Sequence, residues 1–422
     1  MKVKKIIKVP GDKSISHRSL IFSSIAKGPS VIKSLLKADD VLHTLNILRN
    51  LGVNIIENKN EIIVYGCGKE GLKEPQVVLD TGNSGTGIRL LTGLLAAQPF
   101  VSFITGDNSI VQRPMQRIIT PLTKMGGKII SKSKGRAPLC IIGRDLKGIT
   151  YKMPVASAQV KSCILIAGLF AKGSTTVIEP VLTRDHTERM MEFFGIDIKR
   201  KDLLITLNPP LKDKWFEGKE ILIPGDISSA AYFIIAGLIQ KKRIITIKDV
   251  GINPRRSGFI DLLKSAGAKI YVENIRMWNN EPVANITVEY SPSLRSFEVS
   301  GSLVANVIDE IPILAVLSAF IKGRSVFRDV SELRHKESDR IKAIVENLKN
   351  IGGSVKELSD GFIIEGGKKL KSGKIKSFDD HRIVMSFSIA GLGIKNRIKI
   401  DRVDSVTTSF PEFFTILKEV FR

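Results

Sequence analysis

Along this chain, stretches that are apolar on every side recur at intervals of roughly 70 residues. Each follows a polar cluster and precedes a β-branched segment typical of a strand. In Ser228 to Gln240, the run Phe233 to Ile239 leaves no polar face, so a helix here must be buried in a core or in a membrane. The longest apolar runs, such as Ile311 to Ile321, fall well short of the roughly 18 residues that a membrane span needs. We therefore expect core helices and no interaction with a membrane.

The pattern predicts six copies of one unit, in which an apolar helix, a strand, a second helix and further strands follow one another. The predicted apolar helices are Leu20 to Gly28, Gly85 to Gln98, Ala156 to Gly173, Ser228 to Gln240, Asp309 to Gly323 and Arg382 to Gly393. The strands after them are Pro29 to Leu35, Val101 to Gly106, Ser174 to Val181, Ile244 to Val250, Arg324 to Val330 and Arg397 to Val403. The second helices end with Leu48 to Val53, Leu122 to Gly127, Met190 to Gly195, Leu262 to Gly267, Leu348 to Gly353 and, at the C-terminus, Phe413 to Arg422. This period fits an α/β fold of six βαβαββ repeats rather than a one-dimensional solenoid.

A chain of 422 residues is long enough for about two domains. The breaks at Pro10-Gly11 and Pro224-Gly225-Asp226 are where we expect the chain to cross between them. The prediction is one discontinuous domain of residues 1–12 and 226–422 and a second domain of residues 13–225, with three repeats in each.

A polar cluster stands at the start of each apolar helix. The six clusters are Lys13 to Arg18, Gly82 to Thr86, Ser157 to Lys161, Asp226 to Ser229, Asp309-Glu310 and Asp379 to Arg382. If the buried helices run parallel within each domain, their N-termini gather on one face, where free N–H groups and the helix dipole favour anions. Two such faces would form a cleft between the domains that suits several phosphate or carboxylate groups.

The net charge of +23 is compatible with this picture. The basic residues are dispersed, without a long basic block, and aromatic residues make up only 6% of the chain, which argues against a nucleic-acid surface. The three cysteines, Cys67, Cys140 and Cys163, are far apart and have no metal-ligand spacing. We expect a reduced, cytoplasmic protein without a signal peptide.

Single motifs in this chain are ambiguous when each is considered alone. The glycine-rich segment Gly82 to Gly87 matches neither a P-loop nor a dinucleotide fingerprint, and a capped turn would explain it. The charged segment Glu332 to Arg340 could be a solvated helix with internal ion pairs. His43 and His186 are interpreted as structural or solvated.

Taken in order, the motifs are specific. They are Lys13-Ser14-Ile15-Ser16-His17-Arg18, Gly82-Asn83-Ser84-Gly85-Thr86, Gln112-Arg113-Pro114-Met115, Ser157-Ala158-Gln159-Val160-Lys161-Ser162, Arg184-Asp185-His186-Thr187-Glu188, Arg334-His335-Lys336-Glu337-Ser338-Asp339-Arg340 and Asp380-His381-Arg382. In this order and over essentially the whole chain, they closely resemble the 5-enolpyruvylshikimate-3-phosphate synthase family of enolpyruvyl transferases. The resemblance implies a two-domain inside-out α/β barrel, with three βαβαββ units in each domain.

The resemblance also implies a set of site residues. Shikimate 3-phosphate would be bound by Lys13, Ser14, Arg18, Ser157, Ala158, Gln159, Thr183, Asp309 and Lys336. Phosphoenolpyruvate would be bound by Lys13, Asn83, Gly85, Arg113, Gln159, Arg340 and Arg382. Asp309 would accept the proton of the attacking 5-hydroxyl, Glu337 with Lys13 would transfer a proton at the enol carbon, and His381 would support that site.

The implied reaction joins these two substrates and releases phosphate, as the sixth step of the shikimate pathway. Addition of a hydroxyl and elimination of phosphate through a tetrahedral ketal need a base, an acid and surrounding cations. We expect no metal and no cofactor. We further expect a monomer that binds small anions and no nucleic acid, closes around its substrates with phosphoshikimate first, and is inhibited by glyphosate because Gly85 keeps the small residue of sensitive members.

Three positions depart from the family pattern. Thr408 stands where many members have a lysine, Ala158 replaces a frequent serine, and Glu332 occupies a position that is Asn in some relatives. The first change puts one phosphoenolpyruvate contact in doubt, and the second removes a hydroxyl from the phosphate site.

Three alternatives remain open. The related transferase that acts on UDP-N-acetylglucosamine begins with Lys-Asn and carries a loop cysteine, whereas Lys13 is followed by Ser14 and residues 107–116 contain no cysteine. A basic RNA-binding protein would explain the charge but not the acidic pair Asp309 and Glu337. The third alternative, a non-catalytic relative within a multifunctional polypeptide, is disfavoured by the length of the chain.

Overall fold

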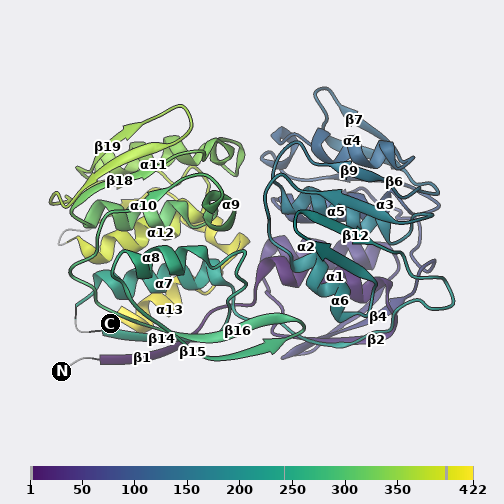
Figure 1. Cartoon of the computed structure of the whole chain (residues 1–422), viewed down its shortest axis with the longest axis horizontal. Coiled ribbons are helices and arrows are strands. Elements are labelled where there is room, and N and C mark those ends of the chain that lie inside the picture. The colour runs from purple at the N-terminus through teal and green to yellow at the C-terminus, as the bar shows by residue number, and fades with distance from the viewer. Residues whose placement is uncertain (1–2, 242, 395–397, 422) are drawn as a thin grey trace. The chain divides into compact units, whose positions relative to one another are not determined.

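The computed structural model describes residues 3–241, 243–394 and 398–421, which fall into two compact units (Figure 1). Unit 1 comprises Met1–Pro10, Pro224–Arg276 and Pro282–Arg422, and unit 2 comprises Gly11–Ile223 and Met277–Glu281. The chain thus changes units two residues before each boundary expected from the sequence. Residues 277–281 group with unit 2, which no sequence signal indicated.

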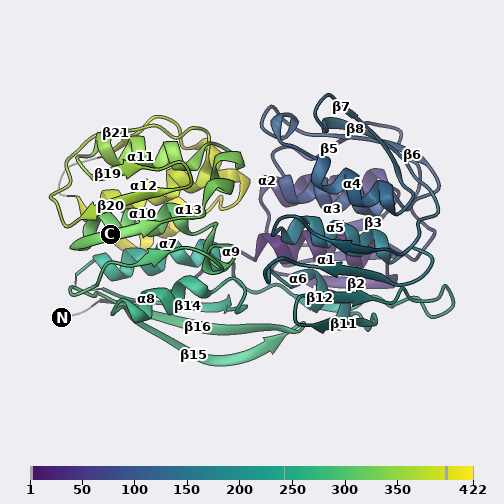
Figure 2. The same ribbon diagram turned by 45° about the horizontal axis from the view of Figure 1, so that its top comes forward.

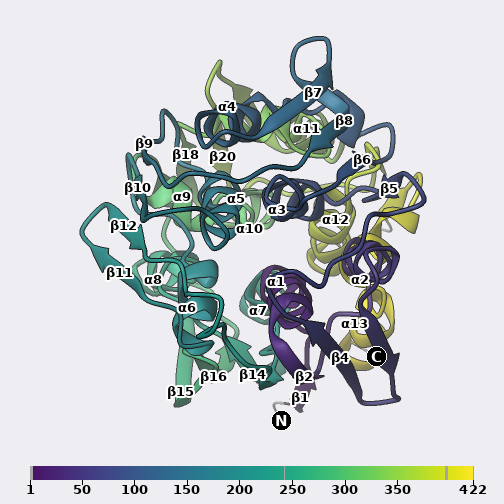
Figure 3. The same cartoon turned by 90° about the vertical axis from the view of Figure 1, so that its right-hand side faces the viewer.

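Unit 2 surrounds three buried helices with three four-stranded sheets. The buried helices are α1 (Lys13–Ile25), α3 (Gly85–Leu95) and α5 (Ala158–Gly168), and α2 (Asp39–Asn50), α4 (Gln116–Lys124) and α6 (His186–Phe193) are the second helices of the repeats. Figure 3 looks nearly along these helices, with the strands outside them. The first sheet has the order β13 (Glu220–Leu222), β2 (Lys27–Lys33), β4 (Glu61–Cys67), β3 (Asn54–Glu57). The second is β5 (Leu79–Asp80), β6 (Val101–Thr105), β8 (Arg136–Ile142), β7 (Lys128–Lys132), and the third is β9 (Thr150–Lys152), β10 (Thr175–Ile178), β12 (Leu204–Leu207), β11 (Ile198–Lys201).

Unit 1 repeats this plan, and its last copy has fewer strands among the residues that the structure describes. Its buried helices are α7 (Ile227–Ile239), α10 (Ile311–Phe320) and α12 (His381–Gly393), which Figure 2 shows as an inner layer of the unit. The other helices are α8 (Gly258–Ser265), α9 (Leu303–Val307), α11 (Arg340–Asn350) and α13 (Phe413–Phe421). The sheets are β1 (Val3–Lys8), β14 (Arg243–Gly251), β16 (Glu281–Glu289), β15 (Lys269–Trp278); then β17 (Glu298–Val299), β18 (Gly323–Phe327), β20 (Phe362–Gly366), β19 (Ser354–Glu357); and, within the described residues, the pair β21 (Lys374–Ile375), β22 (Lys399–Ile400).

The repeats share one strand pattern. In each four-stranded sheet the first pair is parallel, and the antiparallel strands follow it. A parallel pair needs a long crossover connection, which the buried helix provides. In the repeats that begin at α1 and α7, however, the first strand comes from a distant part of the chain: β13 pairs with β2, and β1 pairs with β14. The six predicted repeats and the two-unit α/β fold are therefore confirmed, with two exchanged strands.

The predicted boundaries of the apolar helices differ at both ends, and the largest difference is at the start of α1. Helix α1 begins at Lys13, seven residues before the predicted start, because Asp12 caps it by accepting a hydrogen bond from the Ile15 N–H at 2.9 Å. Two of its buried serines, Ser19 and Ser24, donate to carbonyls of the preceding turn at 2.9 and 2.7 Å. Much of this polar sequence is therefore buried without loss of hydrogen bonds. Of the last predicted strand, β22 is present, while Arg397 lies outside the described residues, as does Arg422 at the end of the last predicted helix.

The prediction that the apolar helices are core helices is confirmed. In α7 every residue from Ile227 to Leu238 is buried, and α10 is buried from Ile311 to Ala319. Each large apolar side chain buried in this way contributes about 1.5–3 kcal/mol. Across the described ranges, every helix is too short or too polar to cross a membrane.

Candidate active site

The starts of the buried helices in unit 2 meet through polar side chains. Ser84, the N-cap of α3, lies 3.3 Å from the Nε2 atom of His17 in α1. Gln159 in the first turn of α5 donates to the Thr86 hydroxyl at 3.0 Å and accepts from Arg89 at 2.8 Å, both in α3. The three N-termini therefore gather within this unit, as the sequence predicts.

Arg18 is an almost fully enclosed cation of this face, with 3% of its surface exposed. Its guanidinium donates to the hydroxyls of Thr187 and Ser162, each at 2.7 Å, and to the Ser14 carbonyl at 2.8 Å. Burial lowers the pKa of Arg18 to about 10, so the side chain stays charged at neutral pH. Arg18 is thus a fixed positive charge, and its neighbours limit the directions in which its guanidinium can donate further hydrogen bonds.

Lys13 and His17 have different roles in the same helix turn. The Lys13 ammonium pairs with Asp40 at 2.8 Å, and its side chain is 19% exposed. His17 is fully buried beside the Thr44 hydroxyl at 2.8 Å. Burial, followed by the charges of Lys13 and Arg18, lowers the pKa of His17 well below its usual value, so the ring is neutral at pH 7. Lys13 therefore supplies charge here, and His17 supplies packing and hydrogen bonds.

Gly85, the first residue of α3, faces two guanidinium groups. A Cβ atom at this position would lie 2.6 Å from Nη1 of Arg113 and 3.0 Å from Nη1 of Arg89. Arg113 is 8% exposed and donates to the Ser109 hydroxyl at 3.2 Å, while Asn83, two residues before Gly85, donates to Asp107 at 2.6 Å. The absence of a side chain at Gly85 is therefore what allows Arg113 to approach this helix start.

The start of α5 and the loop after β10 contribute small polar groups. The Ser157 hydroxyl caps α5 by accepting from the Val160 N–H at 3.4 Å, and Ala158 follows it with only a methyl group. Thr183, 4% exposed, donates both its N–H, at 3.2 Å, and its hydroxyl to the carboxylate of Glu179. These groups lie in the same unit as Arg18 and are held by buried partners.

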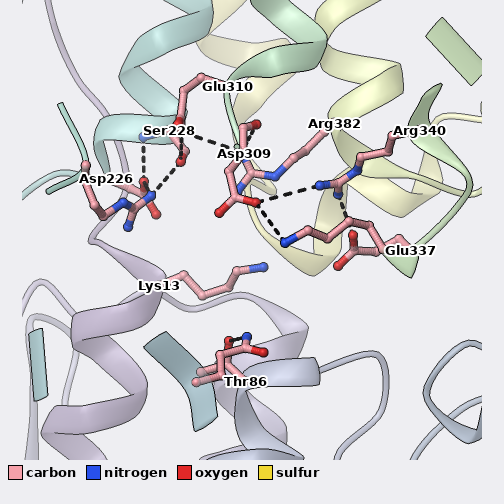
Figure 4. A network of polar contacts seen from close by, with 12 residues as sticks. Lys13, Thr86, Asp226, Ser228, Asp309, Glu310, Glu337, Arg340 and Arg382 are labelled. Carbon is pink, nitrogen blue, oxygen red and sulfur yellow. Dashed lines mark hydrogen bonds and ion pairs between the residues drawn. The ribbon is translucent and has the colours of Figure 1, made fainter. Parts of the chain in front are cut away.

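In unit 1, one carboxylate is surrounded by cations. Within 4 Å of the Asp309 carboxylate oxygens are the ammonium of Lys336 at 3.6 Å and the guanidinium groups of Arg340 and Arg382, each at 3.8 Å (Figure 4). Arg382 also donates to the Asp309 carbonyl at 2.8 Å. Burial, the largest single effect, opposes the charge of Arg382, but Asp309 together with Tyr232, Glu310 and Asp226 overcomes it and raises the pKa of Arg382 above its usual value. The Asp309 side chain is 13% exposed, so it is mostly enclosed but still accessible.

Arg340 is bound to two further carboxylates. It donates to Asp380 through Nε at 2.7 Å and Nη2 at 3.2 Å, and to Glu337 at 2.5 Å. Burial disfavours the charged form of Arg340, but the charges of Asp380 and Glu337 together overcome this effect and raise the pKa of Arg340. Arg340 in turn lowers the pKa of Asp380, although burial by itself would raise it. His381, 4% exposed, follows Asp380, the N-cap of α12. This rigid arrangement fixes the guanidinium and leaves Glu337 partly exposed beside it.

The structure thus brings the expected residues into two clusters, one in each unit. The unit 2 cluster contains Lys13, Ser14, Arg18, Asn83, Gly85, Arg113, Ser157, Ala158, Gln159 and Thr183. The unit 1 cluster contains Asp309, Lys336, Glu337, Arg340, His381 and Arg382.

Of the departures from the family pattern, Thr408 in the 3₁₀ turn Asp404–Thr408 donates its hydroxyl to the Ser405 carbonyl at 2.8 Å. His186 is buried and lies 2.7 Å from Glu281, which agrees with its interpretation as a structural histidine.

Two charged residues, Arg89 and Arg256, were missed by the sequence analysis. Arg89 supports Gln159, and in unit 1 Arg256 donates at 2.6 Å to the Ser228 hydroxyl, which in turn donates to Glu310. The signal that could have found Arg89 is a single charged residue in an otherwise apolar helix, because such a charge must have a partner.

Other features of the described residues do not join these clusters. A hollow of about 910 Å³ in unit 2 is lined by Lys27, Cys67, Lys69 and Lys212 among others, and it contains none of the expected site residues. Lys212 at its rim is paired with Glu70 at 2.6 Å. Among the same described residues, no group of three or more His, Cys, Asp or Glu side chains is arranged to hold a metal ion.

Comparison with known proteins agrees with this geometry. The family model described as EPSP synthase (3-phosphoshikimate 1-carboxyvinyltransferase) matches residues 1–417. The chain is 48% identical to the 3-phosphoshikimate 1-carboxyvinyltransferase of Petrotoga mobilis, over 98% of this chain and 96% of that protein. It is 47% identical to the enzyme of the same name from Persephonella marina, over 99% and 97%. The solved structure of the EPSP synthase from Acinetobacter baumannii, 44% identical, superimposes with a TM-score of 0.88 over 100% of this chain and 96% of that one.

A full-length family match, near-complete coverage of relatives at this level of identity, and a matching fold of both units lead to one conclusion. The chain is a member of the EPSP synthase (3-phosphoshikimate 1-carboxyvinyltransferase) family.

Proposed function

We propose that this enzyme transfers the enolpyruvyl group of phosphoenolpyruvate to the 5-hydroxyl of 3-phosphoshikimate and releases phosphate, in the shikimate pathway to aromatic amino acids. Membership of the family supports the activity. The observation that carries it to particular residues is the Asp309 carboxylate, which lies within 4 Å of Lys336, Arg340 and Arg382. The reaction joins two anions through a hydroxyl group of one of them. It therefore needs a base for that hydroxyl and cations around the negative charges.

Shikimate 3-phosphate is assigned mainly to the unit 2 cluster. Arg18 supplies a buried positive charge, and Ser157 and Thr183 supply hydroxyl and N–H groups near the start of α5. The remaining residues of this substrate set are Lys13, Ser14, Ala158, Gln159, Asp309 and Lys336. A helix N-terminus with neighbouring hydroxyl groups is a suitable site for a phosphate.

Phosphoenolpyruvate is assigned to three arginines and the glycine turn. Arg113 approaches the helix start at Gly85, and Asn83 lies next to it. Arg340 and Arg382 carry fixed charges in unit 1, and Lys13 and Gln159 complete the set. Arginine is suited to this task because its planar donors match carboxylate and phosphate groups.

The proton transfers follow from these assignments. Asp309 accepts the proton of the 5-hydroxyl while the hydroxyl oxygen bonds to the central carbon of phosphoenolpyruvate. The methylene carbon of phosphoenolpyruvate receives a proton from Glu337 or Lys13. In the resulting tetrahedral ketal the C–O bond to the phosphate then breaks, the phosphate leaves with the bonding electrons, and return of a methyl proton to the same Glu337 or Lys13 group restores the double bond. His381 supports the Glu337 site through its place beside Asp380.

We extend the proposal to the domains and their surroundings. The two units act as domains whose clusters converge on the substrates and exclude water when both are bound. The protein works as a monomer in the cytoplasm, and glyphosate inhibits it by competing for the phosphoenolpyruvate groups at Gly85 and Arg113.

Phosphate release on mixing the two substrates tests the proposal. Wild-type protein should release phosphate only when both substrates are present, and Asp309→Ala, Glu337→Gln and Lys13→Met should each reduce the rate about a hundredfold or more. Asp145→Ala is a matched control, since it removes a carboxylate that forms an exposed ion pair with Lys172, and its rate should be unchanged. Release with UDP-N-acetylglucosamine in place of phosphoshikimate, or an Asp309→Ala variant of full activity, would overturn the assignment.

A further inference from the structure

A lysine that the mechanism does not use is completely buried behind the unit 2 cluster. Lys161, one turn into α5, has 0% of its surface exposed. Its ammonium lies 2.9 Å from a Glu179 oxygen and 2.6 Å from a Glu188 oxygen, and both glutamate side chains are 1% exposed. Burying three charged groups is costly unless each is compensated, so this triad requires an explanation.

The triad leads directly to two residues of the phosphoshikimate set. The second oxygen of Glu179 accepts the N–H and the hydroxyl of Thr183. Glu188 stands next to Thr187, and Lys161 next to Ser162, the two hydroxyls that hold the Arg18 guanidinium. Lys161 therefore joins α5, α6 and the loop after β10 at the points that set the positions of Thr183 and Arg18.

The two glutamates of the triad differ in the cations that surround them. Two carboxylates face one ammonium, which leaves one negative charge. Glu188 is also compensated by Arg18, whose pKa it raises against the larger, lowering effect of burial. Burial raises the pKa of Glu188 itself, and Lys161 opposes that rise. For Glu179, in contrast, Lys161 is the one cation in contact among the residues that the structure describes.

We propose that Lys161 is a positioning residue for 3-phosphoshikimate: it neutralises Glu179 behind Thr183 and so allows an anionic substrate to bind at the Thr183 hydroxyl. This inference rests on the proposed function. Without the ammonium, the buried Glu179 carboxylate repels the substrate phosphate and keeps the hydrogen bond from the Thr183 hydroxyl. With it, the hydroxyl can turn from Glu179 to the substrate. Lys161 touches no substrate, since it is enclosed on all sides.

Two double variants of equal net charge separate this role from a general structural one. Lys161→Met with Glu179→Gln removes the pair behind Thr183 and leaves Glu188 beside Arg18. Lys161→Met with Glu188→Gln leaves Glu179 uncompensated behind Thr183. Each double variant buries one carboxylate and no ammonium, so comparison of the two does not depend on whether Lys161→Met alone folds.

Calorimetric titration of the full-length proteins with 3-phosphoshikimate measures the effect. The variant that keeps Glu179 should bind at least about tenfold more weakly than the one that keeps Glu188, as expected for an uncompensated like charge at short range. Lys161→Arg should bind within about threefold of wild type, and Lys172→Met, an exposed lysine of the same unit, should match wild type. In phosphate-release assays the KM for phosphoenolpyruvate should change less than the KM for phosphoshikimate.

Equal affinities of the two double variants would overturn the role of Lys161 while leaving the proposed function intact. Failure of the wild-type protein to bind phosphoshikimate at all would overturn the proposed function, and this inference with it.

Discussion

Replacing Gly85 by alanine introduces one methyl group at the point where α3 faces Arg113. The added Cβ would lie 2.6 Å from Nη1 of Arg113, about 1 Å closer than an ordinary contact. The backbone at Gly85 is helical, so the change introduces no backbone strain. The guanidinium must therefore retreat by about 1 Å, and Arg89, with 3.0 Å to the same methyl, by less.

This displacement should have a small effect on the free energy of unfolding and a large effect on substrate binding. The guanidinium is the flexible end of its side chain, so we expect a loss of at most about 1–3 kcal/mol in the free energy of unfolding. A positioned group that moves by about 1 Å can cost up to about a hundredfold in catalysis. Since Arg113 is assigned to phosphoenolpyruvate, its KM should rise about ten- to a hundredfold in Gly85→Ala. The KM for phosphoshikimate should change less than the KM for phosphoenolpyruvate, because Arg18 and Thr183 have no contact with this methyl and Gln159 is reached only through the smaller shift of Arg89.

Steady-state phosphate release, with one substrate varied at a saturating concentration of the other, measures both constants. Gly391→Ala is the matched control: it adds the same methyl to a helix, and the nearest atom lies at 3.9 Å. A Gly85→Ala enzyme with the wild-type KM for phosphoenolpyruvate would refute the argument, because Arg113 would then have moved without consequence.

Further predictions concern stability, pH and inhibition. Asp380→Asn leaves the buried Arg340 without its two-point partner, so urea unfolding should show a loss of about 3 kcal/mol or more; a loss below about 1 kcal/mol would contradict the buried ion pair. The pKa of His17 is depressed in the folded protein, so its contribution to stability is complete above the unfolded value of about 6.5 and is lost as the pH falls. From about pH 7.5 to about pH 5.5, wild type should therefore lose about 1.4 kcal/mol more than His17→Gln, and equal losses would disprove this. Glyphosate should inhibit competitively with phosphoenolpyruvate, and unchanged turnover at millimolar glyphosate would exclude this. Phosphoshikimate should make the protein more compact in small-angle scattering, and identical profiles with and without it would argue against substrate-driven closure.

The hydrophobic pattern alone was sufficient for the repeated α/β plan and its buried helices. A helix such as α7, apolar around its whole circumference, has no stable position other than a core, so its burial follows from local sequence. The polar clusters at the helix starts could also be recognised from local sequence. The first N–H groups of a helix have no partner within the helix, so particular cap residues are favoured there. The gathering of these starts within each unit followed from parallel packing.

The partners of individual strands and charges could not be obtained in this way. That β13 pairs with β2 and β1 with β14 depends on which edge is free after the chain has crossed between units, and any short β-branched segment could fill either edge. The start of α1 was placed too late because buried serines such as Ser19 look like surface residues until their hydrogen bonds to the preceding turn are seen.

The ion pairs show the same division most clearly. Sequence marks Lys161 and Arg340 as charged residues beside apolar ones, and it therefore requires that each has a partner. Only the tertiary structure selects Glu179 and Glu188 for the first and Asp380 for the second. The reason is physical: periodicity records whether a side chain is buried, whereas the energy of a buried charge depends on distances to groups that lie far away along the chain.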